Sequence, residues 1–399
     1  MTGLSKTRLE RMRDVMAGHV ERGDVPGLVS LVSRRGEVHV EAFGVKSLDA
    51  SDPMRRDTIF RIASMTKPVT AVAAMILVEE CRLRLDEPVD RLLPELADRR
   101  VLVRLDGPLD QTVPARRPIS VRDLLTLRMG FGYIMEVSSD YPIQKAASAL
   151  QVLVGAPKPQ SLPAPDEWIR GIGTLPLMHQ PGERWMYDLG LDVLGVLIAR
   201  AAGQPLPTFL RERVFEPLGM DDTGFSVPPE KLGRLASCYE RDPRTGLFEV
   251  YDGARDSQWS RPPAFPAGAS GLVSTADDYL AFCQMLLDKG RCGRERILSR
   301  PSVELMTRDQ LTPEQRASAG IILGEGRGWG FGMSVVTRRD DLAATPGRFG
   351  WDGGLGTSGH SDPAEELVGI LLTQRMMDSP EPPRVFTDFW TSAYQTIDD

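Results

Sequence analysis

The segment Ser64-Met65-Thr66-Lys67 places a hydroxyl and an amine three residues apart, directly before a long apolar run. On a helix, residues i and i+3 lie on one face, so the Ser64 hydroxyl and the Lys67 amine can meet. A hydroxyl beside a proton acceptor is the minimum that covalent acyl transfer needs. Lys67 is also the only lysine of the chain with a serine three residues before it. The pair is therefore a candidate nucleophile and base.

The run from Pro68 to Val78 (PVTAVAAMILV) lacks a polar face, which predicts a buried helix with Ser64 near its N-terminus. Proline is tolerated in the first helical turn, and a helix N-terminus favours developing negative charge. An isolated motif of this length is better explained by an N-cap serine and a solvated first-turn lysine. Other segments of the chain have to decide between these interpretations.

Two further segments carry groups that acyl transfer could use. Tyr187, in PGERWMYDLG, offers a phenol that could shuttle the nucleophile's proton if it lay near Ser64 and Lys67. The segment FGWDGG (349–354) offers glycines that let a substrate approach the backbone, and the amides of Gly354 and Ser64 could form an oxyanion hole. Each segment taken alone also fits a purely structural role, as a core aromatic and as a strand end with a tight turn.

Charge and hydropathy exclude several classes of function. A net charge of −7 argues against nucleic-acid binding, because phosphate recognition normally needs a basic surface. No stretch approaches the roughly 20 apolar residues that span a bilayer, and the N-terminal segment has no signal-peptide core. We therefore expect a cytoplasmic protein that contacts neither membrane nor nucleic acid.

Cysteines and histidines are few and scattered, which argues against disulfides and metal sites. No Cys-x-x-Cys and no His-Glu-x-x-His spacing occurs, so we expect free thiols, no metal and no cofactor. The residues concerned are Cys81, Cys238, Cys283, Cys292, His19, His39, His179 and His360.

The order of predicted elements indicates an α+β fold built from both ends of the chain. A helix over 5–23 and strands over 28–33 and 37–43 precede the Ser64 helix, and a mainly helical stretch follows. Strands are predicted over 328–336, 348–354 and 366–374, with helices over 277–290 and 383–397. This order predicts an antiparallel sheet flanked by N- and C-terminal helices (residues 1–84 and 266–399) and a mainly helical lobe (residues 85–265). A cleft between the two is the expected place for a small-molecule site.

Three motifs in this order resemble those of a known family: S-M-T-K at 64–67, Tyr187 in its PGxxWxY context, and W-D-G at 351–353. The chain is similar to the serine hydrolases of the class C β-lactamase and penicillin-binding-protein type, and in particular to the family VIII carboxylesterases. The likeness extends over about residues 20 to 375, including LLTLRMGFGY (124–133) and GASGLVSTADDYLAFCQMLL (268–287). It implies a class C β-lactamase-like fold.

The resemblance also implies roles for particular residues. Ser64 would be the nucleophile, Lys67 and Tyr187 would share the general-base work, and the amides of Ser64 and Gly354 would bind the oxyanion. The positions expected to contact substrate are Tyr133, Asp188, Leu189, Trp351, Gly353 and Gly359.

Four of these positions depart from the family pattern. Leu189 stands where β-lactamases and DD-peptidases usually carry Asn, and Trp351 stands where they carry Lys or His. The loss of both polar groups suits a neutral ester better than a β-lactam. Asp188, where Ser is commoner, would repel an anionic substrate if it faces the cleft. Gly359 replaces a bulky aromatic side chain, which predicts a wider acyl or alcohol pocket.

The sequence thus predicts a serine carboxylesterase that hydrolyses small, neutral esters through an acyl-enzyme on Ser64. The alternatives are an acyltransferase using the same intermediate, a weak β-lactamase or DD-peptidase-like amide hydrolase, and a non-catalytic binding protein on this fold. Retention of Ser64, Lys67 and Tyr187 argues against the last. The expected partner is a small-molecule ester, and the oligomeric state is left open.

Overall fold

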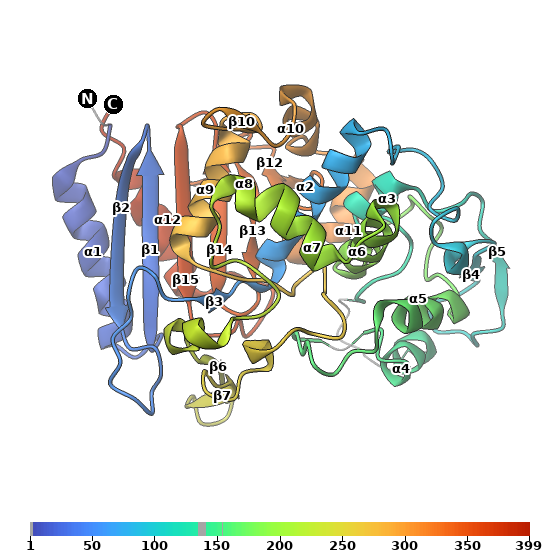
Figure 1. The fold of residues 1–399 in the computed structure, drawn as a ribbon, viewed down its shortest axis with the longest axis horizontal. Coiled ribbons are helices and arrows are strands. Elements are labelled where there is room, and N and C mark those ends of the chain that lie inside the picture. The colour runs from blue at the N-terminus through green and yellow to red at the C-terminus, as the bar shows by residue number, and fades with distance from the viewer. Residues whose placement is uncertain (1–2, 135–140, 154) are drawn as a thin grey trace.

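The computed structural model, which describes residues 3–134, 141–153 and 155–399, contains a seven-stranded antiparallel sheet that joins both ends of the chain (Figure 1). The strand order across the sheet is β11-β12-β13-β14-β15-β1-β2. Blue β1 and β2 therefore lie beside the red C-terminal strands (Figure 1). The strand bounds are β1 Gly27–Arg34, β2 Glu37–Gly44, β11 Arg327–Trp329, β12 Ser334–Val336, β13 Phe349–Gly353, β14 Thr357–Asp362 and β15 Leu367–Thr373.

The first hairpin shows why these residues form strands. Arg35 and Gly36 both have positive φ, 50° and 83°, which is the turn geometry whose twist matches two antiparallel strands. In β1, Leu28 and Val32 face one side of the sheet, and Val29 and Leu31 face the other. Every residue of β1 is buried, so both faces of this strand are covered.

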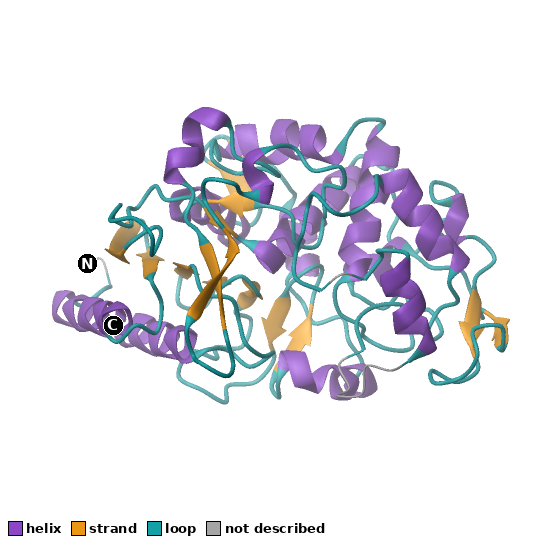
Figure 2. Cartoon of the chain, turned by 90° about the horizontal axis from the view of Figure 1, so that it is seen from below, coloured by secondary structure: helices purple, strands orange, loops and turns teal. Residues whose placement is uncertain are grey.

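Helices α1 (Lys6–Glu21) and α12 (Arg384–Gln395) cover one face of the sheet, side by side (Figure 2). Their apolar faces pack on Leu28, Val32 and the outward residues of β15. At Gly369 a Cβ would collide with the Trp390 ring, so glycine lets α12 approach the strand closely. The predicted antiparallel sheet with flanking terminal helices is confirmed.

The other face of the sheet packs against α2 (Thr66–Glu79) and α9 (Ala276–Leu287). As predicted, α2 is a core helix, buried from Thr66 to Leu77. The remaining α-helices are α3 Val121–Leu125, α4 Pro142–Ala149, α5 Pro165–Thr174, α6 Leu189–Ala202, α7 Leu206–Leu210, α8 Glu216–Leu218, α10 Arg300–Met306 and α11 Pro313–Leu323.

A mainly helical region runs from α3 to α8; α3 to α6 lie beside the sheet, whereas α8 lies in front of it near α9 (Figure 1). It also holds short strands that the sequence does not predict: β4 (Arg100–Leu102) paired with β5 (Thr112–Pro114), and β6 (Cys238–Arg241) paired with β7 (Phe248–Asp252). One continuous hydrophobic core runs from the sheet through α2 into α6. A division at residues 85 and 265 therefore stays a prediction.

Four further short strands occur in two pairs: β3 Phe60–Arg61 with β8 Val273–Ser274, and β9 Arg291–Cys292 with β10 Glu295–Arg296. Among the described residues, no single helix is long and apolar enough to cross a membrane. The pair Leu189–Ala202 and Leu206–Leu218 meets the criterion only together and is bent by 80°.

The strand pattern of the C-terminal part differs from the prediction in two places. The expected strand over 328–336 is two strands, β11 and β12, joined by a turn at residues 330–333. The segment TSGHSD, which has no apolar alternation, forms the fully buried strand β14. It is stable there because its polar side chains find partners inside the protein, as His360 does with Asp352 at 3.0 Å.

Candidate active site

Ser64 lies in a 3₁₀ turn (Ala63–Met65) that leads directly into α2, so it is held at the start of a core helix. Ala63, immediately before it, has a φ of 42°, a left-handed conformation that non-glycine residues rarely adopt. Strained backbone of this kind persists where the surrounding structure fixes it, and it is frequent at functional sites. Ser64 is 9% exposed, so its hydroxyl lies at the edge of the core.

Lys67 is completely buried one helical turn later, which excludes the interpretation of a solvated lysine. Its Nζ donates hydrogen bonds to Ser64 Oγ at 3.0 Å, to Asp188 Oδ1 at 2.5 Å and to the Ala269 carbonyl at 3.0 Å. Three acceptors for three N–H groups are the full complement of an ammonium ion. The structure therefore holds Lys67 as a cation whose donors are all occupied.

Tyr187 lies on the other side of the nucleophile, with its Oη 2.8 Å from Ser64 Oγ. Trp351, on β13, donates its indole N–H to the same phenolic oxygen at 2.8 Å. The Lys67 ammonium also lies 4.5 Å from the centre of the Tyr187 ring. The phenolic oxygen thus receives one donor, and the ring that carries it lies beside one cation. Both groups would stabilise negative charge on the side chain.

Asp188 connects the tyrosine to the lysine. Its backbone, with φ 88° and ψ −74°, lies near the strained γ-turn conformation, directly before α6. This bend turns the carboxylate back to Lys67 while Tyr187 points to Ser64. The site thus has two strained residues: Ala63 directly precedes Ser64, which contacts Lys67, and Asp188 contacts Lys67 through its own carboxylate.

Electrostatics agree with a cationic Lys67. Burial acts to lower the pKa of Lys67, but the carboxylate of Asp188, with Tyr187 and Asp192 nearby, outweighs it and raises that pKa above its ordinary value. Asp192 lies one turn after Asp188 on α6 and accepts a hydrogen bond from the Ala269 amide at 2.8 Å. Its burial, with the charge of Asp188, raises the pKa of Asp192 to about 8.

The expected oxyanion donors lie on adjoining segments. A Cβ on Gly353 would collide with the carbonyl of Ile62, so the end of β13 passes directly against the chain entering the nucleophile turn. Among the backbone hydrogen bonds of the described residues, none uses the amide of Ser64 or Gly354 as a donor. The role of these two amides stays a prediction that this arrangement supports.

Two expectations about substrate contacts need correction. Asp188 does not present a free anion to the cleft, because its side chain is 14% exposed and is paired with Lys67. Gly359 does not open a wider pocket, because the space of its missing side chain is filled by Tyr279 and Met65. Leu189 begins α6 with 2% exposure and so presents little surface of its own.

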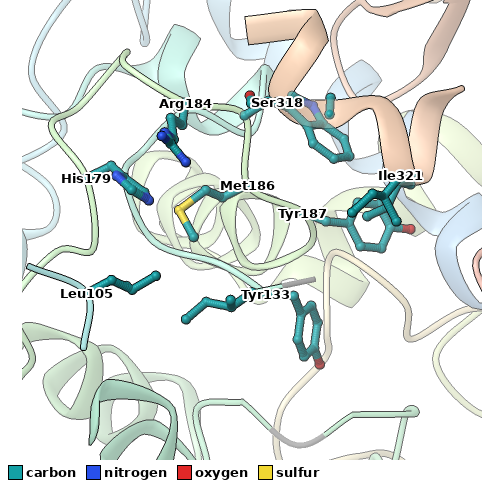
Figure 3. Close-up of a pocket in the computed structure, with 12 residues that line it drawn as sticks. Leu105, Tyr133, His179, Arg184, Met186, Tyr187, Ser318 and Ile321 are labelled. Carbon is teal, nitrogen blue, oxygen red and sulfur yellow. The ribbon is translucent and has the colours of Figure 1, made fainter. Parts of the chain in front are cut away.

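Two cavities border this cluster. The first is lined by Tyr187, Tyr133 and a set of mostly apolar residues that reaches Arg184 (Figure 3). The second is lined by Asp188, Leu189, Asp192 and Tyr133, among others. Tyr133 lies between them and is fixed by hydrogen bonds with both the carbonyl and the amide of Gly155, at 3.2 and 3.1 Å. Burial raises the pKa of Tyr133 well above its ordinary value, so this phenol is neutral.

Three groups that contribute to this site were not predicted from the sequence. The Ala269 carbonyl and the Asp192 carboxylate complete the surroundings of Lys67, and Trp351 acts through its N–H as well as its ring. Of these, only Trp351 carried a signal, because a buried indole N–H needs an acceptor. In the described part of the chain, no cluster of three or more His, Cys, Asp and Glu side chains is arranged to hold a metal ion.

Comparison with known proteins agrees with this geometry. The family model described as Beta-lactamase matches residues 12–386. The chain belongs to the Beta-lactamase family. Esterase EstB of Burkholderia gladioli is 34% identical over 365 residues, which cover 87% of this chain and 85% of the esterase. Protein Rv1367c of Mycobacterium tuberculosis is 42% identical over 368 residues, 90% of this chain and 88% of its own.

The fold of this chain as a whole is similar to that of a solved structure. EstCE1, described as a hydrolase with promiscuous acyltransferase activity, superposes with a TM-score of 0.80 at 26% identity and covers 98% of this chain and 99% of its own. The predicted family and the predicted class C β-lactamase-like fold are confirmed.

Proposed function

We propose that this protein is a serine esterase that cleaves carboxylic esters through an acyl-enzyme on Ser64. The observation that carries the proposal is the contact of Ser64 Oγ with both Lys67 Nζ, at 3.0 Å, and Tyr187 Oη, at 2.8 Å. A nucleophile between a fixed cation and a proton acceptor is the arrangement that activates a hydroxyl. The similarity to esterase EstB supports the same reaction type.

In the first half of the reaction, Tyr187 acts as a phenolate: Ser64 Oγ attacks the ester carbonyl, and its proton passes to the Tyr187 oxygen. Lys67 does not take this proton, because its three N–H groups are already donated and Asp188 keeps it charged. The Trp351 N–H and the Lys67 ammonium stabilise the phenolate that accepts it. Tyr187 then gives the proton to the departing alcohol oxygen, and the acyl group stays on Ser64.

In the second half, water takes the place of the alcohol and the same groups act again. Tyr187 accepts a proton from water as it attacks the acyl carbonyl, and returns that proton to Ser64 Oγ when the acid leaves. The amides of Ser64 and Gly354 would hold the carbonyl oxygen in both halves, and no cofactor takes part in either step. The part of the substrate next to Leu189 and Trp351 is proposed to be uncharged, in line with the expected small, neutral esters, since neither residue offers the polar contacts that a β-lactam uses.

Replacement of the nucleophile tests the proposal. Ser64→Ala should lower kcat on p-nitrophenyl esters by roughly 10³ to 10⁶, and a phosphonate probe should label wild-type Ser64 alone. Ser51→Ala, which changes an exposed serine in a loop, is the matched control and should keep both activity and labelling. If Ser64→Ala kept more than about a tenth of wild-type activity, the assignment would be wrong.

Acyl transfer is a second candidate, because EstCE1 combines hydrolase and acyltransferase activities by its own description. An added alcohol would compete with water for the acyl-enzyme, and partition of the acyl group between the two products measures this directly. We also propose a cytoplasmic location, which the four free thiols support.

A further inference from the structure

The cavity next to Tyr187 differs in charge from the cavity next to Asp188. Among the described residues, no carboxylate lines the first, and its potentially cationic lining groups are Arg184 and His179. The second is lined by Lys158, by Asp188, which is paired with Lys67, and by Asp192, whose pKa burial raises to about 8. A substrate that extends from the cluster into the first cavity therefore meets a positive group that no described lining carboxylate neutralises.

Arg184 is an exposed guanidinium at the end of the first cavity. Within the described part of the chain it makes no hydrogen bond or ion pair, although most arginines near the site have one. Figure 3 shows Arg184 and His179 on one side of the cavity, across from Tyr187. A guanidinium with its donors unused is the side chain best suited to bind a carboxylate through two hydrogen bonds.

Between Arg184 and Tyr187, the walls of the first cavity are mostly apolar. Trp185 and Met186 are buried beneath the cavity, and α11 contributes Ile321 and Ile322 to its rim. Ile321 is 63% exposed, which is unusual for so large an aliphatic side chain and gives the rim an apolar surface. Apolar walls with one fixed charge are typical of a site that binds an amphipathic molecule in one orientation.

The proposed reaction decides which part of the ester occupies this cavity. Tyr187 must give its proton to the departing oxygen, so the alcohol side of the ester has to lie against Tyr187. The cavity lined by Tyr187 therefore receives the alcohol, and the acyl group stays at Ser64 on the other side of the carbonyl.

We propose that the preferred substrates are esters of hydroxy acids: an apolar alcohol portion with a distal carboxylate that pairs with Arg184. This inference rests on the proposed esterase function and names its substrate class. It departs from the expectation of wholly neutral esters, because the far end of the alcohol is anionic. Hydrolysis then yields a carboxylic acid and a free hydroxy acid, and water is the only co-reactant.

The test compares ω-acetoxyalkanoates of increasing chain length with the matching ω-acetoxyalkanamides, which have the same shape without the charge. Acetate release gives kcat/KM for each, and the carboxylate-to-amide ratio is the readout, since it does not depend on the fraction of active enzyme. Wild type should favour the carboxylate at one chain length. Arg184→Gln should lower the ratio about threefold to tenfold, as expected for a partly solvated charge pair, and added salt should lower it in wild type.

Two further variants separate recognition from general electrostatics. Arg184→Lys should keep part of the preference, and Arg13→Gln, an exposed arginine on α1, should keep all of it while changing the net charge equally. A wild-type ratio below one at every chain length, or a ratio unchanged by Arg184→Gln, would overturn the inference. If the acetoxyamides were hydrolysed equally well by Ser64→Ala, the proposed esterase function itself would fail.

Discussion

Trp351→Phe removes one hydrogen bond from the site and leaves an aromatic ring in place. The indole N–H of Trp351 donates to Tyr187 Oη at 2.8 Å, and this oxygen must carry negative charge in order to take the proton of Ser64. A hydrogen bond to a charged group is worth about 1.5–3 kcal/mol. Each 1.36 kcal/mol of transition-state stabilisation is tenfold in rate, so kcat/KM should fall about 10-fold to 150-fold.

The matched control is Trp329→Phe in the same aromatic cluster. The Trp329 ring centre lies 4.8 Å from that of Trp351, but its N–H donates to the Leu125 carbonyl at 3.3 Å and not to Tyr187. Trp329 is fully buried and Trp351 is 7% exposed, so either change removes buried ring area and should lower the free energy of unfolding by about 1–3 kcal/mol. Only Trp351→Phe should lower kcat/KM beyond that structural effect.

The assay is hydrolysis of p-nitrophenyl butyrate, with active enzyme counted by phosphonate titration and stability measured by urea unfolding. The reasoning would be refuted if Trp351→Phe kept more than about half of the wild-type kcat/KM, or if Trp329→Phe lost as much. Either result would mean that Trp351 acts through packing alone, as its position on a sheet strand also allows.

Three other outcomes follow from the same geometry. Lys67→Ala and Tyr187→Phe should each cost nearly as much activity as the double variant, and strictly additive losses of activation free energy would show that they do not act as a unit. Wild type should prefer p-nitrophenyl butyrate to nitrocefin by at least about 100-fold in kcat/KM, because two unpaired polar groups of the β-lactam each cost about 1–3 kcal/mol. A nitrocefin rate equal to the ester rate would favour the β-lactamase alternative. Burial and the charge of Asp188 raise the pKa of Asp192 to about 8, so its contribution to stability is complete below its unfolded pKa near 3.8 and is lost as the pH rises toward 8. Asp192→Asn should therefore flatten the decrease in unfolding free energy between pH 5 and pH 8. Parallel curves for wild type and variant in urea unfolding would contradict this.

Local sequence patterns predicted the parts of the fold in which buried residues recur at regular positions along the chain. The hairpin of β1 and β2, helix α2 and the two terminal helices all carry apolar residues at strand or helix spacing. Strand β14 could not be found in this way, since TSGHSD is polar throughout. Its burial depends on partners elsewhere in the chain, including Asp352 for His360 and Trp390 for Ser358.

The same distinction applies to the site. Ser64 and Lys67 meet because one helical turn separates them, so their contact is a local property that the sequence by itself determined. The pairing of Lys67 with Asp188 and of Tyr187 with Trp351 joins residues 121 and 164 positions apart, and no spacing rule reaches so far. The sequence suggested that Asp188 would repel anions, whereas the fold uses its charge to keep a buried lysine protonated. The residue types therefore determine which chemical groups are available. The charge state of each group depends on tertiary packing, because burial and neighbouring charges exist only in the folded chain.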